Sequence, residues 1–220
     1  MTGLRFRETM TGRIALRALD PVDGYERVDG FATTMHITID IADVAAFIAG
    51  RPDESDTSHE AVMRADVVIP VLGGRFVTAN GRFICFESGQ GPDGTPVQQM
   101  LYTADLVNDD RIFRMTARKV LEPKGWRIWR DTTRLQVKLV DITDDDSTTA
   151  DGADRRPRQL AGVVSITVAE FARQLMSMRP YGDGGWWARW RAVGAYLTFF
   201  VKGLFRIYLG TKIGRLSRSQ

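Results

Sequence analysis

The chain has 220 residues, of which 44% are hydrophobic and 26% charged, and its formal net charge is +3. This composition is typical of a globular protein with a sizeable core. The single cysteine, Cys85, excludes an internal disulfide, and residues 1–17 carry charges without an apolar stretch, which argues against a secretory signal. We therefore expect a cytoplasmic protein.

The first clear element is the alternating segment 31–41, which predicts a strand with Phe31, Met35 and Ile39 on one face. Residues 43–50 predict a short helix that ends at a glycine. Around Asn80-Gly81, residues 75–87 predict a β-hairpin, because this dipeptide favours the positive φ angles of a type I′ turn.

A second hairpin is predicted from residues 97–107 and 111–121, which flank a short polar turn. A third turn at residues 122–125 leads into the segment 126–142, where Asp131, Thr132 and Thr133 predict a turn at a strand edge. After an acidic loop, residues 160–168 predict one more strand.

Residues 169–178 then predict a helix, so helices gather at the end of the chain. Strands that follow strands through short turns predict a mainly β fold, an antiparallel barrel or sandwich in which lipocalin-like closure is possible. We expect an antiparallel β domain over 1–168 and a C-terminal helical extension with a basic tail over 169–220.

The segment 184–210 is the most unusual part of the sequence, because it combines three tryptophans with cations and no acid. Residues 186–209 are long enough to cross a bilayer, but four cations interrupt them. Burying central cations in hydrocarbon costs roughly 3 kcal/mol each. The pattern therefore favours an amphipathic helix over a spanning one.

Three surroundings are open for this helix: its own domain, a membrane surface or a partner protein. The tryptophans and the acid-free basic tail favour peripheral association with an anionic membrane surface, at the inner face of the membrane. The residues expected to contact lipid are Trp186, Trp187, Trp190, Arg191, Phe200, Lys202 and Arg206.

No signature of catalysis, metal binding or dinucleotide binding stands out. The paired glycines of 71–81 lie between strands and precede no helix, and no Cys/His cluster has metal-ligand spacing. We expect neither cofactor nor metal. Nucleic-acid binding is not expected, because the basic residues lie on a strongly apolar helix.

Several stretches occur together in a familiar order: "FRETMTG", "VIPVLGGRFVTANGRFICF", "MLYTADL", "WRIWRDTTRLQVKL" and "GVVSITVAEFARQLMSMR". They resemble a module of unassigned activity in bacterial multidomain proteins of the cholesterol-oxidase type. There it accompanies a flavin-dependent glucose-methanol-choline oxidoreductase domain or an α/β-hydrolase domain. The resemblance covers nearly the whole chain and implies a lipid or steroid context. It carries no catalytic residues, and the flavin domain is absent.

These observations favour a non-catalytic module that binds a hydrophobic small molecule, a lipid or steroid, within a barrel. The candidate ligand-binding residues are Tyr102, Trp126, Trp129, Asp131 and His36. A small lipid-directed isomerase or hydrolase is the alternative, with Asp131, His36 and Tyr102 as proton-transfer groups if they converge in one pocket. A third hypothesis is a docking subunit for a separate oxidoreductase or hydrolase, which a large exposed apolar patch would favour.

Overall fold

The computed structural model describes residues 1–52, 57–91, 94–109, 111–122, 128–143 and 158–213. Its strands are β1 (Thr2–Leu16), β2 (Phe31–Ile41), β3 (Arg51–Pro52), β4 (Thr57–Ile69), β5 (Gly74–Gln90), β6 (Pro96–Asn108), β7 (Arg111–Leu121), β8 (Arg134–Asp141), β9 (Gln159–Ser165) and β10 (Arg179–Gly182). The helices are α1 (Pro21–Glu26), α2 (Val44–Ala49), η1 (Pro70–Leu72), α3 (Ile128–Thr133), α4 (Val168–Met176) and α5 (Trp186–Ile213).

Eight strands form a closed antiparallel barrel, as the sequence predicted for the fold class. β1, β2, β4, β5, β6, β7, β8 and β9 pair in that order, and β9 returns to pair with β1 from Thr11↔Ser165 to Leu16↔Leu160. At its N-terminal end, over Thr2–Arg5, β1 pairs instead with β10. The C-terminal extension therefore contributes a strand to the sheet as well as helices.

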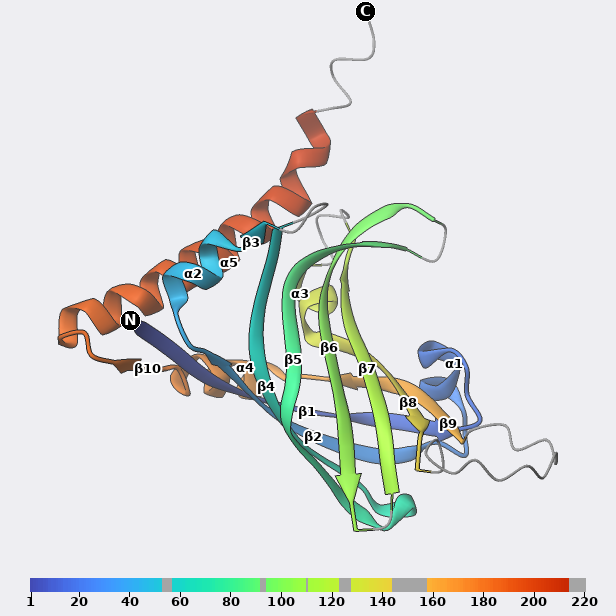
Figure 1. The fold of residues 1–220 in the computed structure, drawn as a ribbon. Coiled ribbons are helices and arrows are strands. Elements are labelled where there is room, and N and C mark those ends of the chain that lie inside the picture. The colour runs from blue at the N-terminus through green and yellow to red at the C-terminus, as the bar shows by residue number, and fades with distance from the viewer. Residues whose placement is uncertain (53–56, 92–93, 110, 123–127, 144–157, 214–220) are drawn as a thin grey trace, which may run out of the picture.

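The helices α2, α3, α4 and α5 all adjoin the same end of the barrel, which we call the helical end. In an antiparallel barrel, successive connections alternate between the two ends. The connection with α2, the connection with α3 and the segment after β9, which contains α4 and α5, therefore lie at the same end. Figure 1 shows α5 running along this end beside α2 and projecting beyond the strands, with α1 at the far side of the molecule. Tyr208 on α5 donates a hydrogen bond to the Asp131 carboxylate on α3 at 3.0 Å, which joins two of these helices.

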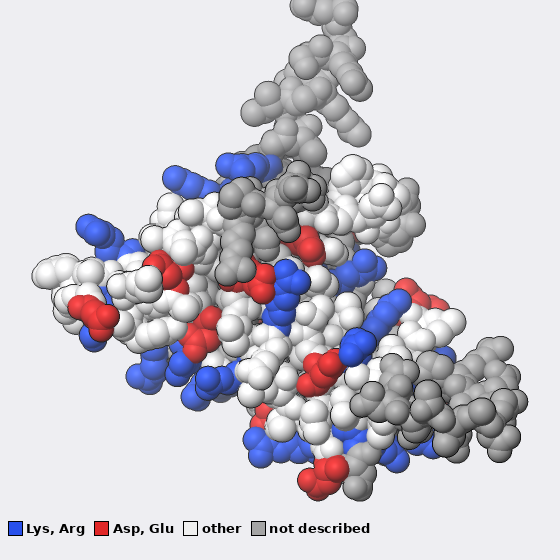
Figure 2. Space-filling model, in the orientation of Figure 1, with Lys and Arg blue, Asp and Glu red and all other residues white. Residues whose placement is uncertain are grey.

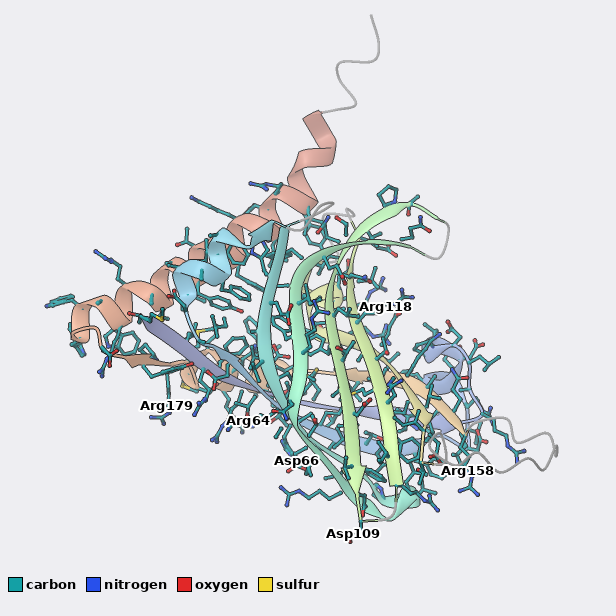
Figure 3. The ribbon with its side chains drawn as sticks, viewed as in Figure 1. Arg64, Asp66, Asp109, Arg118, Arg158 and Arg179 are labelled. Carbon is teal, nitrogen blue, oxygen red and sulfur yellow. The ribbon has the colours of Figure 1, made fainter. Side chains whose placement is uncertain are left out.

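The barrel interior is filled by side chains, as is usual for eight strands. Among the largest fully buried side chains are Phe6, Phe76, Phe83, Tyr102 and Phe113, and the rings of Phe76 and Phe113 meet edge to face at 5.4 Å. Alternate residues point outward, and Figure 3 shows Arg64 and Arg179 directed away from the wall. Any ligand site among the described residues must therefore be sought near the surface of the barrel.

Asn80-Gly81 does not form the predicted hairpin. β5 runs through both residues, and the register of its pairing with β4 shifts between Met63 and Ala65. Gly81 faces Met63 and Ala104, where a larger side chain would overlap the Met63 side chain. The dipeptide lies at an irregularity within this long strand. The chain reverses earlier, between β4 and β5, at Gly73 and Gly74, which both have positive φ.

Two other segments differ from the sequence-based expectation. Trp129 to Thr133 belong to the short helix α3 and not to a strand-edge turn, and the strand begins only at Arg134. β1 was not predicted, although Leu4, Phe6 and Met10 point inward along it. The predicted strand at 31–41, the hairpin of β6 and β7, and the helices α2 and α4 are confirmed.

Cys85 is fully buried, and burial raises the pKa of its thiol well above the ordinary value. Because the thiolate is the reactive form, we expect no reaction of native protein with Ellman's reagent at pH 8. One thiol per chain should react in urea, with a rate that follows unfolding measured by circular dichroism. Rapid labelling of the folded protein would contradict the burial of Cys85.

Candidate functional site

A cleft with a volume of about 920 Å³ opens at the helical end of the barrel, between α5 and the strands β4 to β7. We call it the mouth cleft. Its apolar wall consists mainly of Ile48, Phe86, Val97, Leu121, Phe199 and Ile207. Its polar lining residues are His59, Ser88, Gln98, Thr198, Lys202 and Arg206. Such a volume is within the range of pockets that hold one small ligand, about 300–1,000 Å³.

Phe86 has an unusual backbone conformation in the wall of this cleft. Its φ of 57° lies in the left-handed region, which large side chains rarely adopt, and the pairing of β5 with β6 shifts register between Ile84 and Glu87. The Phe86 ring lies 5.6 Å from the ring of Phe199 and 5.7 Å from that of Phe200 on α5. Strained residues of this kind concentrate at binding and catalytic sites.

Gly203 allows α5 to approach Phe86 closely. A methyl group at this position would overlap the Phe86 ring. The contact therefore requires glycine in the middle of the helix, where glycine is otherwise unfavourable compared with alanine by about 0.5–1 kcal/mol. Glycine at position 203 therefore lowers helix propensity but permits close contact between α5 and the strained part of β5.

His59 is positioned by the helix α2. Its Nδ1 lies 2.7 Å from the carbonyl oxygen of Phe47, and since a carbonyl can only accept, Nδ1 carries the hydrogen. The edge of the ring also contacts Phe199 at a centroid distance of 4.6 Å. The His59 ring is thereby fixed between α2 and α5 at the wall of the cleft.

The helix α5 presents three faces, since successive residues are about 100° apart. One face packs on the barrel: Val193, Tyr196 and Tyr208 are buried, and the Tyr196 ring lies 5.5 Å from that of Phe6. The second face lines the mouth cleft with Lys202 and Arg206. The third points to solvent and carries Trp187, Trp190, Val201 and Phe205, which we call the outer stripe.

The outer stripe is strongly exposed: 79% of Trp187, 49% of Trp190, 45% of Val201 and 56% of Phe205 is accessible. Trp186, at the start of the helix, is 62% exposed and packs edge to face on Trp187. Lys202 and Arg206 thus border the cleft, and the outer stripe beside them is apolar. Of the residues expected to contact lipid, Phe200 is the exception. Its ring turns toward Tyr196 and Phe86 and packs on the core.

The structure does not bring the candidate ligand-binding residues together. Tyr102 is buried inside the barrel, His36 lies on the outer wall 3.1 Å from Thr9 Oγ1, and Asp131 bonds Tyr208. Trp126 lies outside the described residues, and of Trp129 only the backbone, in α3, is described. His36 instead borders a groove of about 450 Å³ on the outer wall, where Asp66 is paired with Arg75.

Burial also governs the ionisation of Asp131 and Tyr208. Loss of solvent raises the pKa of the Asp131 carboxyl, and the hydrogen bond from Tyr208 opposes this shift. The pKa of Tyr208 is raised as well, first by burial and then by the negative charge of Asp131. The pair links α3 to α5 beside the cleft.

A second group of polar side chains lies inside the barrel, and we call it the polar cluster. Glu8 accepts hydrogen bonds from Lys119 at 3.0 Å, from Tyr102 at 3.3 Å and, through its other oxygen, from Gln174 at 2.7 Å. Burial, followed by the charge of Glu8, raises the pKa of Tyr102. Gln174 reaches Glu8 from α4, which lies against β1 where β1 pairs with neither β9 nor β10.

Sequence reasoning missed both the cluster and most of the cleft. A signal for the cluster was present: Glu8 alternates with Phe6 and Met10, and Lys119 with Ala117 and Leu121, so each charge falls on an inward apolar face. No comparable signal existed for Phe86 or His59, because their roles depend on how α5 crosses the barrel end.

Fold and cleft together define an up-and-down antiparallel barrel whose mouth is partly covered by a long helix. No protein-family model, curated protein or solved structure matches the chain. The association with oxidoreductase or hydrolase domains stays a prediction from the sequence. Among the described helices, none is both long and apolar enough to span a bilayer.

Proposed function

We propose that this chain is a non-catalytic lipid-binding protein that takes up a hydrophobic ligand in the mouth cleft while α5 rests on an anionic membrane surface. The observation that carries the proposal is the arrangement of α5. One helix presents the cleft face and the outer stripe side by side, so a ligand leaving a bilayer under the stripe reaches the cleft around the same helix.

The outer stripe has the chemistry of a membrane interface. Tryptophan suits the boundary between hydrocarbon and head groups, and Val201 and Phe205 extend the apolar surface along the helix. α5 contains no acid, and Arg191, Lys202 and Arg206 are exposed beside the stripe. Figure 2 shows Lys and Arg side chains along the upper edge of the molecule, where α5 lies in Figure 1. Cations beside an apolar stripe match an anionic leaflet.

The alternative of a lipid-directed enzyme required convergence of Asp131, His36 and Tyr102. Each of these side chains has a different partner in a different part of the molecule. The geometry therefore favours binding without catalysis by these groups. A separate oxidoreductase or hydrolase is the other occupant that the outer stripe would suit.

Vesicle co-sedimentation tests the membrane part of this proposal. The full chain is expected to pellet with phosphatidylcholine vesicles that contain phosphatidylglycerol, and less so at high salt. Because burying a large apolar side chain contributes about 1.5–3 kcal/mol, the double variant Trp187→Ser/Phe205→Ser should bind at least about tenfold more weakly.

The matched control is Leu19→Ser/Val28→Ser, which removes two side chains that are 70% and 96% exposed away from the helical end. This control should bind vesicles like the parent chain. If the parent chain stays in the supernatant with every vesicle, the membrane proposal is wrong and a protein partner becomes the better occupant of the stripe. Equal losses in both double variants would also contradict it.

A further inference from the structure

We infer that the mouth cleft selects ligands in which an apolar body ends in an anionic group, with the anion held between Lys202 and Arg206. The inference rests on the proposed function, because it specifies the class of ligand for the same cleft. It is argued from the charges that line the cleft, from the burial of its apolar lining residues and from the lack of partners for Lys202 and Arg206 among the described residues.

The charge of the cleft is of one sign. Lys202 and Arg206 lie one helical turn apart on its rim, and among the described residues that line it there is no aspartate or glutamate. Two cations on the rim of a largely apolar cleft match a carboxylate or a phosphate.

The two cations also have no partner among the described residues. Within the part of the chain that the structure describes, neither Lys202 nor Arg206 has an ion pair or a side-chain hydrogen bond. Some other surface arginines are paired: Arg82, for example, donates to the Glu60 carboxylate at 2.8 Å. The cations of the cleft are therefore available to an incoming anion.

Other lining residues of the cleft are apolar and buried. Leu121 is fully buried and Val97 is 5% exposed, whereas Lys202 and Arg206 lie at the exposed surface of α5. Phe86 and Phe199 add aromatic surface to the wall of the cleft. A charged rim above buried apolar residues fits an amphiphilic ligand. Its chain would point into the protein and its head group would stay at the surface, near the outer stripe.

Competition with a fluorescent fatty acid tests the inference without a membrane. cis-Parinaric acid, whose fluorescence rises in apolar surroundings, is titrated into the full chain at pH 8 below the micelle concentration of each lipid. Hexadecanoate, hexadecyl phosphate and hexadecanol then compete for the cleft. The three share one apolar chain, so they differ in the head group alone, and the first two distinguish a carboxylate source from a phosphate source.

We expect either anion to displace the probe at a concentration about tenfold or more below that of hexadecanol, since a charge-assisted hydrogen bond contributes roughly 1.5–3 kcal/mol. The variant Lys202→Met/Arg206→Met keeps the apolar stems and should lose this preference while binding hexadecanol normally. Arg191→Met, a cation on the same helix outside the cleft lining, should behave like the parent chain.

The outcomes test the anionic head group of the ligand and the lipid-binding proposal separately. If hexadecanol competes as well as the anions and the methionine variants change nothing, the anionic head group is wrong and the lipid-binding proposal stands. If neither the probe nor any competitor binds the parent chain, the ligand part of the proposed function fails, whatever the vesicles show. If Arg191→Met loses as much as the double variant, the effect is one of overall charge and the inference is wrong.

Discussion

Replacement of Lys119 by methionine is expected to destabilise the protein by about 3–5 kcal/mol, because it leaves the Glu8 carboxylate buried without its cation. The two side chains are 4% and 5% exposed, and Nζ lies 3.0 Å from the Glu8 oxygen. Lys119 Nζ also lies 5.4 Å from the centroid of the Tyr102 ring, and methionine would lose this cation–π contact. Equilibrium unfolding in urea measures the loss.

The informative control removes both charges. In Glu8→Gln/Lys119→Met the amide oxygen can accept the hydrogen bond from Tyr102, the amide NH2 can donate to the side-chain oxygen of Gln174 once that amide turns over, and no net charge remains buried. The double variant should therefore be markedly more stable than Lys119→Met alone. A single variant that unfolds within about 1 kcal/mol of the parent chain would show that the carboxylate reaches water, contrary to its position.

The polar cluster also bears on how the C-terminal extension is held. Gln174 on α4 completes the bonding of Glu8, and Ser177 accepts the backbone N–H of Arg7 at 2.9 Å, so α4 replaces a neighbouring strand along this part of β1. α5 follows directly through β10. The position of the cleft therefore depends on a buried charge as well as on apolar packing.

The fold class could be predicted because period-2 alternation survives in most strands. Thr33, Met35, Ile37, Ile39 and Ile41 point inward as the pattern required. Asn80-Gly81 misled because a local turn preference was weaker than the pairing of β5 with β4 on both sides of it. α3 was missed because the polar run Asp131 to Thr133 was interpreted as a turn at a strand edge. In the structure the Thr133 carbonyl accepts the N–H of Ile166, and the Thr133 hydroxyl donates to the carbonyl of Arg130.

The site was predicted only in part. The amphipathic pattern identified α5. An apolar face and a polar face, however, do not show which side of the helix packs on the barrel and which faces solvent. In the structure the helix has three environments, and the cations lie between the packed face and the outer stripe. The second wall of the cleft comes from β5 and β6, which are about a hundred residues away in the sequence. No local pattern could relate Phe86 to Lys202 across that separation.

The barrel seam between β1 and β9 provides the second large expected effect. Gly162 and Gly12 lie where the two strands approach most closely, and a methyl group at Gly162 would overlap the backbone carbonyl oxygen of Arg13. Backbone atoms cannot move aside as a flexible side chain can. We therefore expect Gly162→Ala to destabilise the protein by about 3 kcal/mol, at the upper end of the usual cost of overpacking.

Gly194→Ala is the matched control for the seam, because it adds the same methyl group in the middle of α5 where nothing lies within 4 Å. This change should stabilise the protein by about 0.5–1 kcal/mol. Urea midpoints of both variants against the parent chain test the pair of expectations. An unchanged midpoint for Gly162→Ala would mean that β1 and β9 can separate at little cost. In that case the stability that the polar cluster contributes would not depend on the closure of the barrel between β1 and β9.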